Sequence, residues 1–151
     1  MSQSLAAIYI HLTFAPKYRR PCLTDTIRPD LHRYMTGVIK STGSKVLIIN
    51  SVEDHIHLLF RLEKTKSLSY IIEHAKKRTS SWIKTLNGSP NNFAWQSGYG
   101  AFSVSASGIE SVKKYIANQK HHHEKMTYEE ELEILFRKYG VEKYDPELYW
   151  S

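Results

Sequence analysis

The chain has very little cysteine and no long hydrophobic run. Cys22 is the only cysteine among the 151 residues, which excludes a disulfide framework and a zinc site built from several cysteines. At the N-terminus no positively charged segment precedes an apolar stretch, and polar residues interrupt the apolar ones at positions 8–14. Neither a signal peptide nor a membrane span is therefore predicted, and we expect a cytoplasmic protein without a membrane partner.

Acidic residues are scarce before the C-terminal segment. The formal net charge of the chain is +6. From Glu124 onward there are eight acidic and four basic residues, which leaves 17 basic and 7 acidic residues before it, a net charge of +10. A basic body of this kind indicates an anionic partner, of which nucleic acid is the commonest. The length fits one domain over residues 1–151.

Hydrophobic patterning predicts four strands and four helices. The helix starts are marked by Ser67 as an N-cap and by two capping boxes, Ser107 with Glu110 and Thr127 with Glu130. A loop rich in Asn, Gly, Ser and Pro is expected at residues 87–98. We expect strands at residues 7–14, 45–50, 54–60 and 99–105, and helices at 24–43, 68–86, 108–120 and 127–140, with a tail to residue 151.

The order of these elements predicts the fold class. Strand, helix, strand, strand, helix, strand is the β-α-β-β-α-β order of a ferredoxin-like fold, an α+β antiparallel sheet, here with C-terminal helices appended. In that topology the first and third strands lie side by side in the middle of the sheet. The two crossover helices cover one face, and we expect the other face to be open.

Two histidines flank one aliphatic residue in the strand predicted at 54–60. Side chains alternate along a strand, so His55 and His57 project to one face while Ile56, Leu58 and Phe60 project to the other. Since the apolar set faces the crossover helices, the histidines are expected on the open face. The spacing suits two ligands of one metal ion, although such a pair is more often ordinary polar surface.

A tyrosine and a glutamine share a face of the helix predicted at 108–120. Tyr115 and Gln119 are four residues apart and lie on the flank of the apolar stripe of that helix. Taken alone, Tyr115 is better explained as a residue at the edge of the core.

Together these segments resemble the single-tyrosine HUH transposases of small bacterial insertion sequences and the related REP-associated tyrosine transposases. The resemblance covers nearly the whole chain, and the order and spacing of its short motifs are specific. The motifs are Lys17-Tyr18-Arg19-Arg20, Asp54-His55-Ile56-His57-Leu58-Leu59, Trp95-Gln96-Ser97-Gly98-Tyr99 and Tyr115-Ile116-Ala117-Asn118-Gln119.

The resemblance implies a site and a reaction. It places the metal ligands at His55, His57 and Gln119, and the nucleophile at Tyr115. The cofactor would be Mg²⁺ or Mn²⁺, and attack on DNA would leave a 5′-phosphotyrosine and a free 3′-hydroxyl. The expected partners are single-stranded DNA with hairpin ends and a second copy of the chain in a homodimer. Whether Tyr115 acts on its own subunit's site or on the partner's stays open.

Basic residues interspersed with an aromatic residue are the candidates for contact with DNA. Lysine and arginine position a phosphate backbone, and an exposed tyrosine stacks on a base. The candidates are Lys17, Tyr18, Arg19 and Arg20 in the first loop, and Lys76, Lys77 and Arg78 in the second helix.

The triple histidine at 121–123 resembles a metal-binding tract. Adjacent helical residues point about 100° apart, so the three cannot converge on one ion, and we interpret the tract as a solvated helix end. One alternative stays open, that His122 or His123 replaces or assists Gln119 as a ligand.

Three other functions compete with a transposase. A domesticated HUH endonuclease acting on repeated palindromes would use the same residues. A non-catalytic ferredoxin-like module would bind nucleic acid through exposed aromatic residues. A metal-dependent hydrolase would need a carboxylate beside the histidines, and we expect Asp54 to lie on the opposite strand face, poorly placed for that role.

Overall fold

The computed structural model describes residues 2–86 and 92–151, and residues 87–91 of the predicted loop lie outside this description. Four strands form one antiparallel sheet in the order β2-β3-β1-β4. The first and third strands are therefore neighbours in the middle, as the ferredoxin-like order predicts. The elements are β1 (Tyr9–Phe14), η1 (Lys17–Arg19), α1 (Arg28–Ser41), β2 (Lys45–Val52), β3 (His55–Arg61), α2 (Leu68–Lys84), β4 (Gly100–Val104), η2 (Ala106–Gly108), α3 (Ile109–Ala117), α4 (Gln119–His122), α5 (Tyr128–Lys138) and α6 (Pro146–Tyr149).

Local sequence explains several of the helix boundaries. The Ser67 hydroxyl accepts a hydrogen bond from the Tyr70 backbone N–H and caps α2. The capping box of Thr127 and Glu130 is formed at the start of α5. Gly43 follows α1 with a φ of +92°, a conformation that costs a residue with a side chain far more than it costs glycine. No helix within the described ranges is long and apolar enough to cross a membrane.

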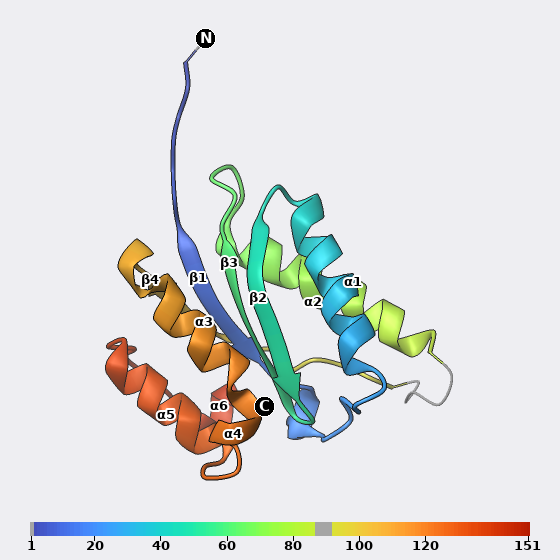
Figure 1. Ribbon diagram of the computed structural model, residues 1–151. Coiled ribbons are helices and arrows are strands. Elements are labelled where there is room, and N and C mark those ends of the chain that lie inside the picture. The colour runs from blue at the N-terminus through green and yellow to red at the C-terminus, as the bar shows by residue number, and fades with distance from the viewer. Residues whose placement is uncertain (1, 87–91) are drawn as a thin grey trace.

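The main core lies between the sheet and helices α1 and α2 (Figure 1). Ile56, Leu58 and Phe60 of β3 are completely buried there, together with Leu31 and Met35 of α1 and their neighbours. This confirms the predicted alternation of β3, because the three apolar side chains face the crossover helices. His55 and His57 consequently lie on the other face of the sheet.

That other face is covered, and the expectation of an open face is wrong. Helices α3, α4 and α5 lie against it (Figure 1), and His55 and His57 have no exposed surface. The physical reason is that α5 has an apolar stripe of its own, which gains stability only when it is buried. Its residues Tyr128, Leu132 and Phe136 pack in one cluster with Phe102 of β4.

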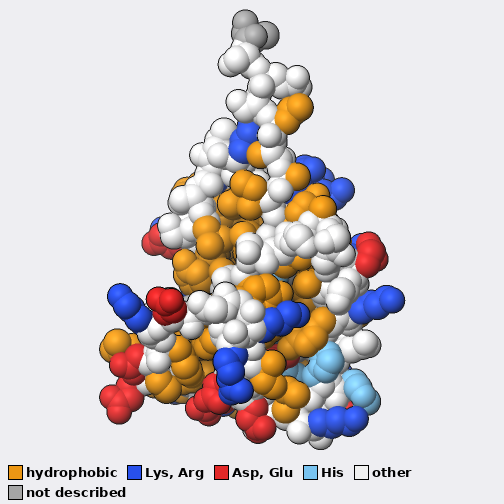
Figure 2. All heavy atoms as spheres, turned by 90° about the vertical axis from the view of Figure 1, so that its left-hand side faces the viewer, with side chains coloured by type: hydrophobic (Ala, Val, Ile, Leu, Met, Phe, Trp, Pro, Cys, Tyr) orange, Lys and Arg blue, Asp and Glu red, His pale blue; other side chains and the backbone are white. Residues whose placement is uncertain are grey.

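The outer surface of this second layer is mixed in character. Figure 2 shows the side of the molecule that carries α3 and α5, where hydrophobic side chains are interspersed with charged ones and acidic side chains gather near the lower edge. Glu130 and Glu133 of α5 are exposed, whereas Glu131 is buried on the inner side of the helix.

The helix predicted at 108–120 is broken in two. Helix α3 ends at Ala117, Asn118 leaves helical geometry with φ −96° and ψ 21°, and α4 begins at Gln119. The Ser107–Glu110 capping box is not formed either, because Gly108 is the residue before α3 and no side chain caps it. The break turns the chain so that Gln119 has no exposed surface.

Candidate active site

The two histidines of β3 each form a hydrogen bond through Nδ1. His55 Nδ1 lies 2.7 Å from Asp54 Oδ1, and His57 Nδ1 lies 2.8 Å from Nε2 of His11, a residue of β1. Partners on the outer ring nitrogen fix the orientation of an imidazole and leave Nε2 free to face a ligand. Asp54 was expected to be poorly placed, but the turn before β3 brings its carboxylate onto the outer side of His55.

A third imidazole enters the cluster from the segment after α4. His123 Nε2 lies 3.1 Å from Gln119 Oε1 and 3.2 Å from Glu131 Oε1, and its Nδ1 lies 3.0 Å from the carbonyl oxygen of Met126. The interpretation of the triple histidine as a solvated helix end is therefore wrong for His123. Its side chain is only 14% exposed.

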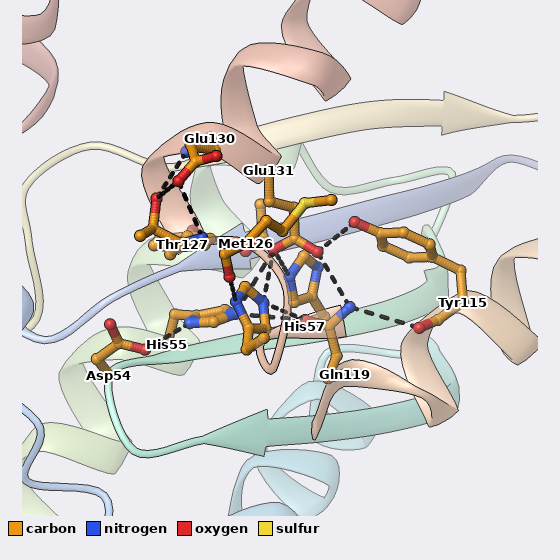
Figure 3. Close-up of polar contacts among 12 residues, drawn as sticks. Asp54, His55, His57, Tyr115, Gln119, Met126, Thr127, Glu130 and Glu131 are labelled. Atoms are coloured by element: carbon orange, nitrogen blue, oxygen red, sulfur yellow. Dashed lines mark hydrogen bonds and ion pairs between the residues drawn. The ribbon is translucent and has the colours of Figure 1, made fainter. Parts of the chain in front are cut away.

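The carboxylate of Glu131 lies at the centre of the imidazoles (Figure 3). Its Oε1 is 2.9 Å from His57 Nε2 and 3.6 Å from His55 Nε2. One ligand atom each from His55, His57, His123 and Glu131 lies within 4.8 Å of all the others, so the four residues could hold one metal ion. Imidazole nitrogens with a carboxylate oxygen are an ordinary donor set for a divalent transition metal.

The protonation states follow from burial and from these contacts. Burial alone would raise the pKa of Glu131, but hydrogen bonds from His123 and His57 outweigh it and hold this pKa well below its usual range. Burial lowers the pKa of His57 to about 4, against the opposing effect of Glu131, so His57 is neutral near pH 7. For His123 the hydrogen bond to Glu131 outweighs burial and raises the pKa.

Tyr115 reaches the same carboxylate from α3. Its hydroxyl donates a short hydrogen bond to Glu131 Oε2, and Gln119 Nε2 donates to the same oxygen at 3.3 Å (Figure 3). Burial first, and then the negative charge of Glu131, raise the pKa of Tyr115 far above its ordinary value. In this arrangement Tyr115 is a neutral phenol, which is a poor nucleophile.

An aromatic side chain of α5 covers the cluster of imidazoles. The ring of Tyr128 stacks on His55, with centroids 3.9 Å apart, and the Tyr128 hydroxyl lies 2.7 Å from Thr13 Oγ1 of β1. His55, His57 and Gln119 have no exposed surface. In this arrangement a phosphate group therefore cannot contact these three side chains.

The first group of basic candidates lies in and beside η1. The Lys17 backbone N–H donates to the Ala94 carbonyl oxygen at 2.8 Å, and Tyr18 is 66% exposed. Arg19 lies 3.6 Å from Glu129 of α5, and its guanidinium lies over the ring of Trp150. Arg20 is exposed.

The second group lies on α2, on the sheet face opposite the histidines. The Lys76 ammonium donates to the carbonyl oxygens of Gln96 and Gly98, at 2.9 and 2.7 Å. Lys77 and Arg78 are exposed. Segment 94–98 thus contacts both basic groups, and beside α2 it borders a hollow of about 550 Å³.

The four residues of the predicted site meet in one place. His55, His57, Gln119 and Tyr115 all contact Glu131, which the sequence analysis missed together with His11 and Tyr128. A signal for Glu131 was present, because it lies beside Leu132 in the buried stripe of α5. A glutamate in such a stripe needs a buried partner of opposite charge or several hydrogen-bond donors.

One protein-family model matches most of the chain but ends before two residues of the cluster. The sequence model of the family described as "Transposase IS200 like" matches residues 4–119, which include His55, His57, Tyr115 and Gln119. His123 and Glu131 lie beyond the matched segment. A comparison with curated protein sequences found no significant match.

Two solved structures have a similar fold. One is a chain from Deinococcus radiodurans R1 whose assignment as a transposase is itself provisional, with a TM-score of 0.63, 20% identity and coverage of 79% of this chain and 98% of the other. The second is a REP-associated tyrosine transposase bound to a REP hairpin, with a TM-score of 0.58, 15% identity and coverage of 82% and 74%. The family match spans well over half of the sequence, and the chain therefore belongs to the family of IS200-like transposases.

Proposed function

We propose that this protein cuts and rejoins single-stranded DNA through a covalent 5′-phosphotyrosine at Tyr115. The observation that supports this most directly is that the Tyr115 hydroxyl and the His55–His57 pair converge on one carboxylate, Glu131. A tyrosine beside a candidate metal site is an arrangement that suits phosphoryl transfer to a phenol. Family membership supports the same reaction.

The reaction conserves the energy of the phosphodiester bond. The Tyr115 oxygen attacks the scissile phosphorus, the 3′-oxygen leaves and is protonated, and the phosphate stays esterified to tyrosine. Attack by a 3′-hydroxyl on this ester then joins two DNA strands and returns the proton to Tyr115, so no ATP is needed.

The cluster offers donors for a divalent ion, and we propose Mg²⁺ or Mn²⁺ in that role. His55, His57 and Gln119 would hold it, with His123 and Glu131 as further ligands from the C-terminal segment. When bound, the ion would polarise the phosphate and stabilise the leaving oxygen. In this closed arrangement Glu131 keeps Tyr115 protonated, so attack requires that the charge of Glu131 be offset or that the carboxylate move away.

The substrate we propose is single-stranded DNA with hairpin ends. The REP hairpin held by one structural neighbour supports a hairpin, and the net charge of +10 before Glu124 supports a phosphate backbone. The contacts that we propose are Lys17, Tyr18, Arg20, Lys77 and Arg78. Lys77 borders the hollow beside segment 94–98, whereas Arg78 borders a separate hollow beside α1. Two ends must be cut in transposition, so we propose a homodimer in which Tyr115 serves the site of its own chain.

Covalent capture on denaturing gels tests the reaction. The probe is single-stranded DNA from the hairpin-forming flank of the gene, labelled at its 3′ end, because that fragment keeps the 5′-phosphotyrosine. Wild-type protein with Mn²⁺ should give a protein-linked band, Tyr115→Phe should give none, and Tyr70→Phe on the remote helix α2 should behave as wild type. A wild-type protein that binds this DNA without forming the band would contradict the proposal and favour a binding module.

A second arm separates transposition from a nuclease function. An added strand with a free 3′-hydroxyl should be joined to the labelled fragment, with loss of the protein-linked band. Covalent attachment without joining would instead support the domesticated endonuclease.

A further inference from the structure

His11 is a buried histidine to which the proposed reaction assigns no role. It lies on β1, beside β3, and has 1% of its surface exposed. Its Nε2 is 2.8 Å from His57 Nδ1, and its ring is 5.1 Å from that of His57. A hydrogen bond between two imidazole nitrogens needs one nitrogen that carries a proton and one that carries a lone pair.

In the arrangement described, the direction of this bond is fixed by Glu131. An ionised carboxylate only accepts hydrogen bonds, so His57 Nε2, at 2.9 Å from Glu131 Oε1, must carry a proton. A neutral His57 then has its lone pair on Nδ1. His11 Nε2 consequently carries a proton and donates it to His57 Nδ1.

A cation on His57 reverses the direction. Nε2 must give up its proton to bind the ion, so the ring proton of a neutral His57 moves to Nδ1. His57 Nδ1 now donates, and His11 Nε2 must accept. The proton on His11 Nε2 passes to His57 Nδ1. The proton on His57 Nε2 leaves the site, and His11 takes up another proton at Nδ1. Each ring therefore still holds one proton.

The other two imidazoles of the cluster have partners of a different kind. His55 Nδ1 faces the carboxylate of Asp54, and His123 Nδ1 faces the carbonyl oxygen of Met126. Both partners accept hydrogen bonds only, so they favour a proton on Nδ1, and each ring can bind an ion through Nε2 once that nitrogen carries no proton. His55 Nε2 lies 3.3 Å from Gln119 Oε1, and without a proton on Nε2 the two atoms suit a cation between them.

We propose that His11 is a positioning residue of the metal site, which exchanges a ring proton with His57 as the ion binds. The inference rests on the proposed function, because it requires an ion at His57. Its physical basis is that His11 alone among these outer partners both donates and accepts, so it stabilises His57 in the metal-free form and in the metal-bound form.

Metal titration of two His11 variants tests the affinity. Mn²⁺ binding is measured by calorimetry on the full chain. His11→Phe keeps a ring but removes the polar nitrogens, and it should weaken Mn²⁺ binding by about 10- to 100-fold, the usual effect of losing an outer partner of a metal ligand. His11→Gln places an amide at the depth of Nε2, both donates and accepts, and should stay within a few-fold of wild type. Thermal unfolding of both variants, monitored by circular dichroism, measures how far each remains folded.

Nitrogen NMR of the histidine rings tests the mechanism directly. Without metal, His57 should carry its proton on Nε2, and with the diamagnetic ion Mg²⁺ on Nδ1. A His57 that keeps the same tautomer in both states would overturn the inference. So would wild-type Mn²⁺ affinity in a folded His11→Phe variant.

A matched pair of variants separates this inference from the proposed function. His55→Ala and His57→Ala should abolish Mn²⁺ binding at the cluster. If both still bind the ion as tightly as wild type, the metal site itself is wrong. If they lose it while His11→Phe keeps it, only the role of His11 is wrong.

Discussion

Glu131 accepts a hydrogen bond from the Tyr115 hydroxyl through Oε2, while its Oε1 lies 2.9 Å from His57 Nε2. One carboxylate therefore links the candidate nucleophile to the candidate metal ligands. It comes from α5, outside the segment that matches the transposase family. The protonation of Tyr115 and the occupancy of the imidazoles are consequently coupled through a single charge.

Replacing Glu131 with Gln should lower the pKa of Tyr115. Burial raises that pKa most, and the negative charge of Glu131 raises it further, so removing the charge removes the second effect and leaves the first. The pKa should fall but stay above 10. It can be followed by NMR with tyrosine labelled at the carbon that bears the hydroxyl. Glu133→Gln, on the exposed side of the same helix, is the matched control, and an unchanged Tyr115 in Glu131→Gln would contradict the assignment.

The metal-free protein should lose stability as the pH falls from about 6.5 to 4. Burial lowers the pKa of His57 to about 4 and that of His11 to about 3, so the unfolded chain binds protons there that the folded chain does not. Each such group reduces the free energy of unfolding by up to about 1.4 kcal/mol per pH unit in that range. Burial also lowers the pKa of His32 to about 4, which adds a third group of the same sign, whereas the raised pKa of His123 affects stability only above about pH 6.5.

Urea unfolding at pH 7, 6 and 5 in the presence of a chelator measures this dependence. The His11→Gln variant removes one of these histidines, so its free energy of unfolding should fall less steeply with decreasing pH than that of wild type. Equal slopes would show that His11 titrates in the folded chain as it does in the unfolded one.

The hydrogen bond between Thr13 and Tyr128 should contribute to the attachment of α5 to the sheet. Thr13→Val leaves the buried Tyr128 hydroxyl without this partner, which should cost about 1 to 3 kcal/mol. Tyr128→Phe should cost a similar amount, and the double variant should cost less than the sum of the two. Urea unfolding of the four proteins gives the coupling energy, and strictly additive losses would mean that the two hydroxyls do not interact.

The sequence predicts much of the sheet and half of the site, for a physical reason. The alternation of His55 and His57 with the apolar residues Ile56 and Leu58 is a local property of one strand, so it can be read without the fold. The histidines are covered because the apolar stripe of α5 packs over them. Such a stripe predicts that a helix is buried on one side, but it does not predict which part of the fold the helix packs against. The contact of Glu131 with His55 and His57 could not be predicted, because these two histidines lie more than 70 residues away along the chain.

Lys76 and its two basic neighbours on α2 should have different roles. Burial lowers the pKa of Lys76 to about 8, and its ammonium donates to the carbonyl oxygens of Gln96 and Gly98. Lys76→Met should therefore destabilise segment 94–98, with a loss in urea unfolding of about 1 to 3 kcal/mol.

Lys77 and Arg78 are exposed, and changing both to Ala should leave stability within about 0.5 kcal/mol of wild type. If both contact phosphates, the double variant should bind the single-stranded hairpin DNA more weakly, and the slope of log affinity against log salt should fall by about 1.4, since each phosphate contact to a single strand contributes about 0.7. Fluorescence anisotropy at several salt concentrations measures that slope. An unchanged slope in the double variant would place the DNA path elsewhere, and a loss of stability would mean that these side chains, like Lys76, hold the fold instead.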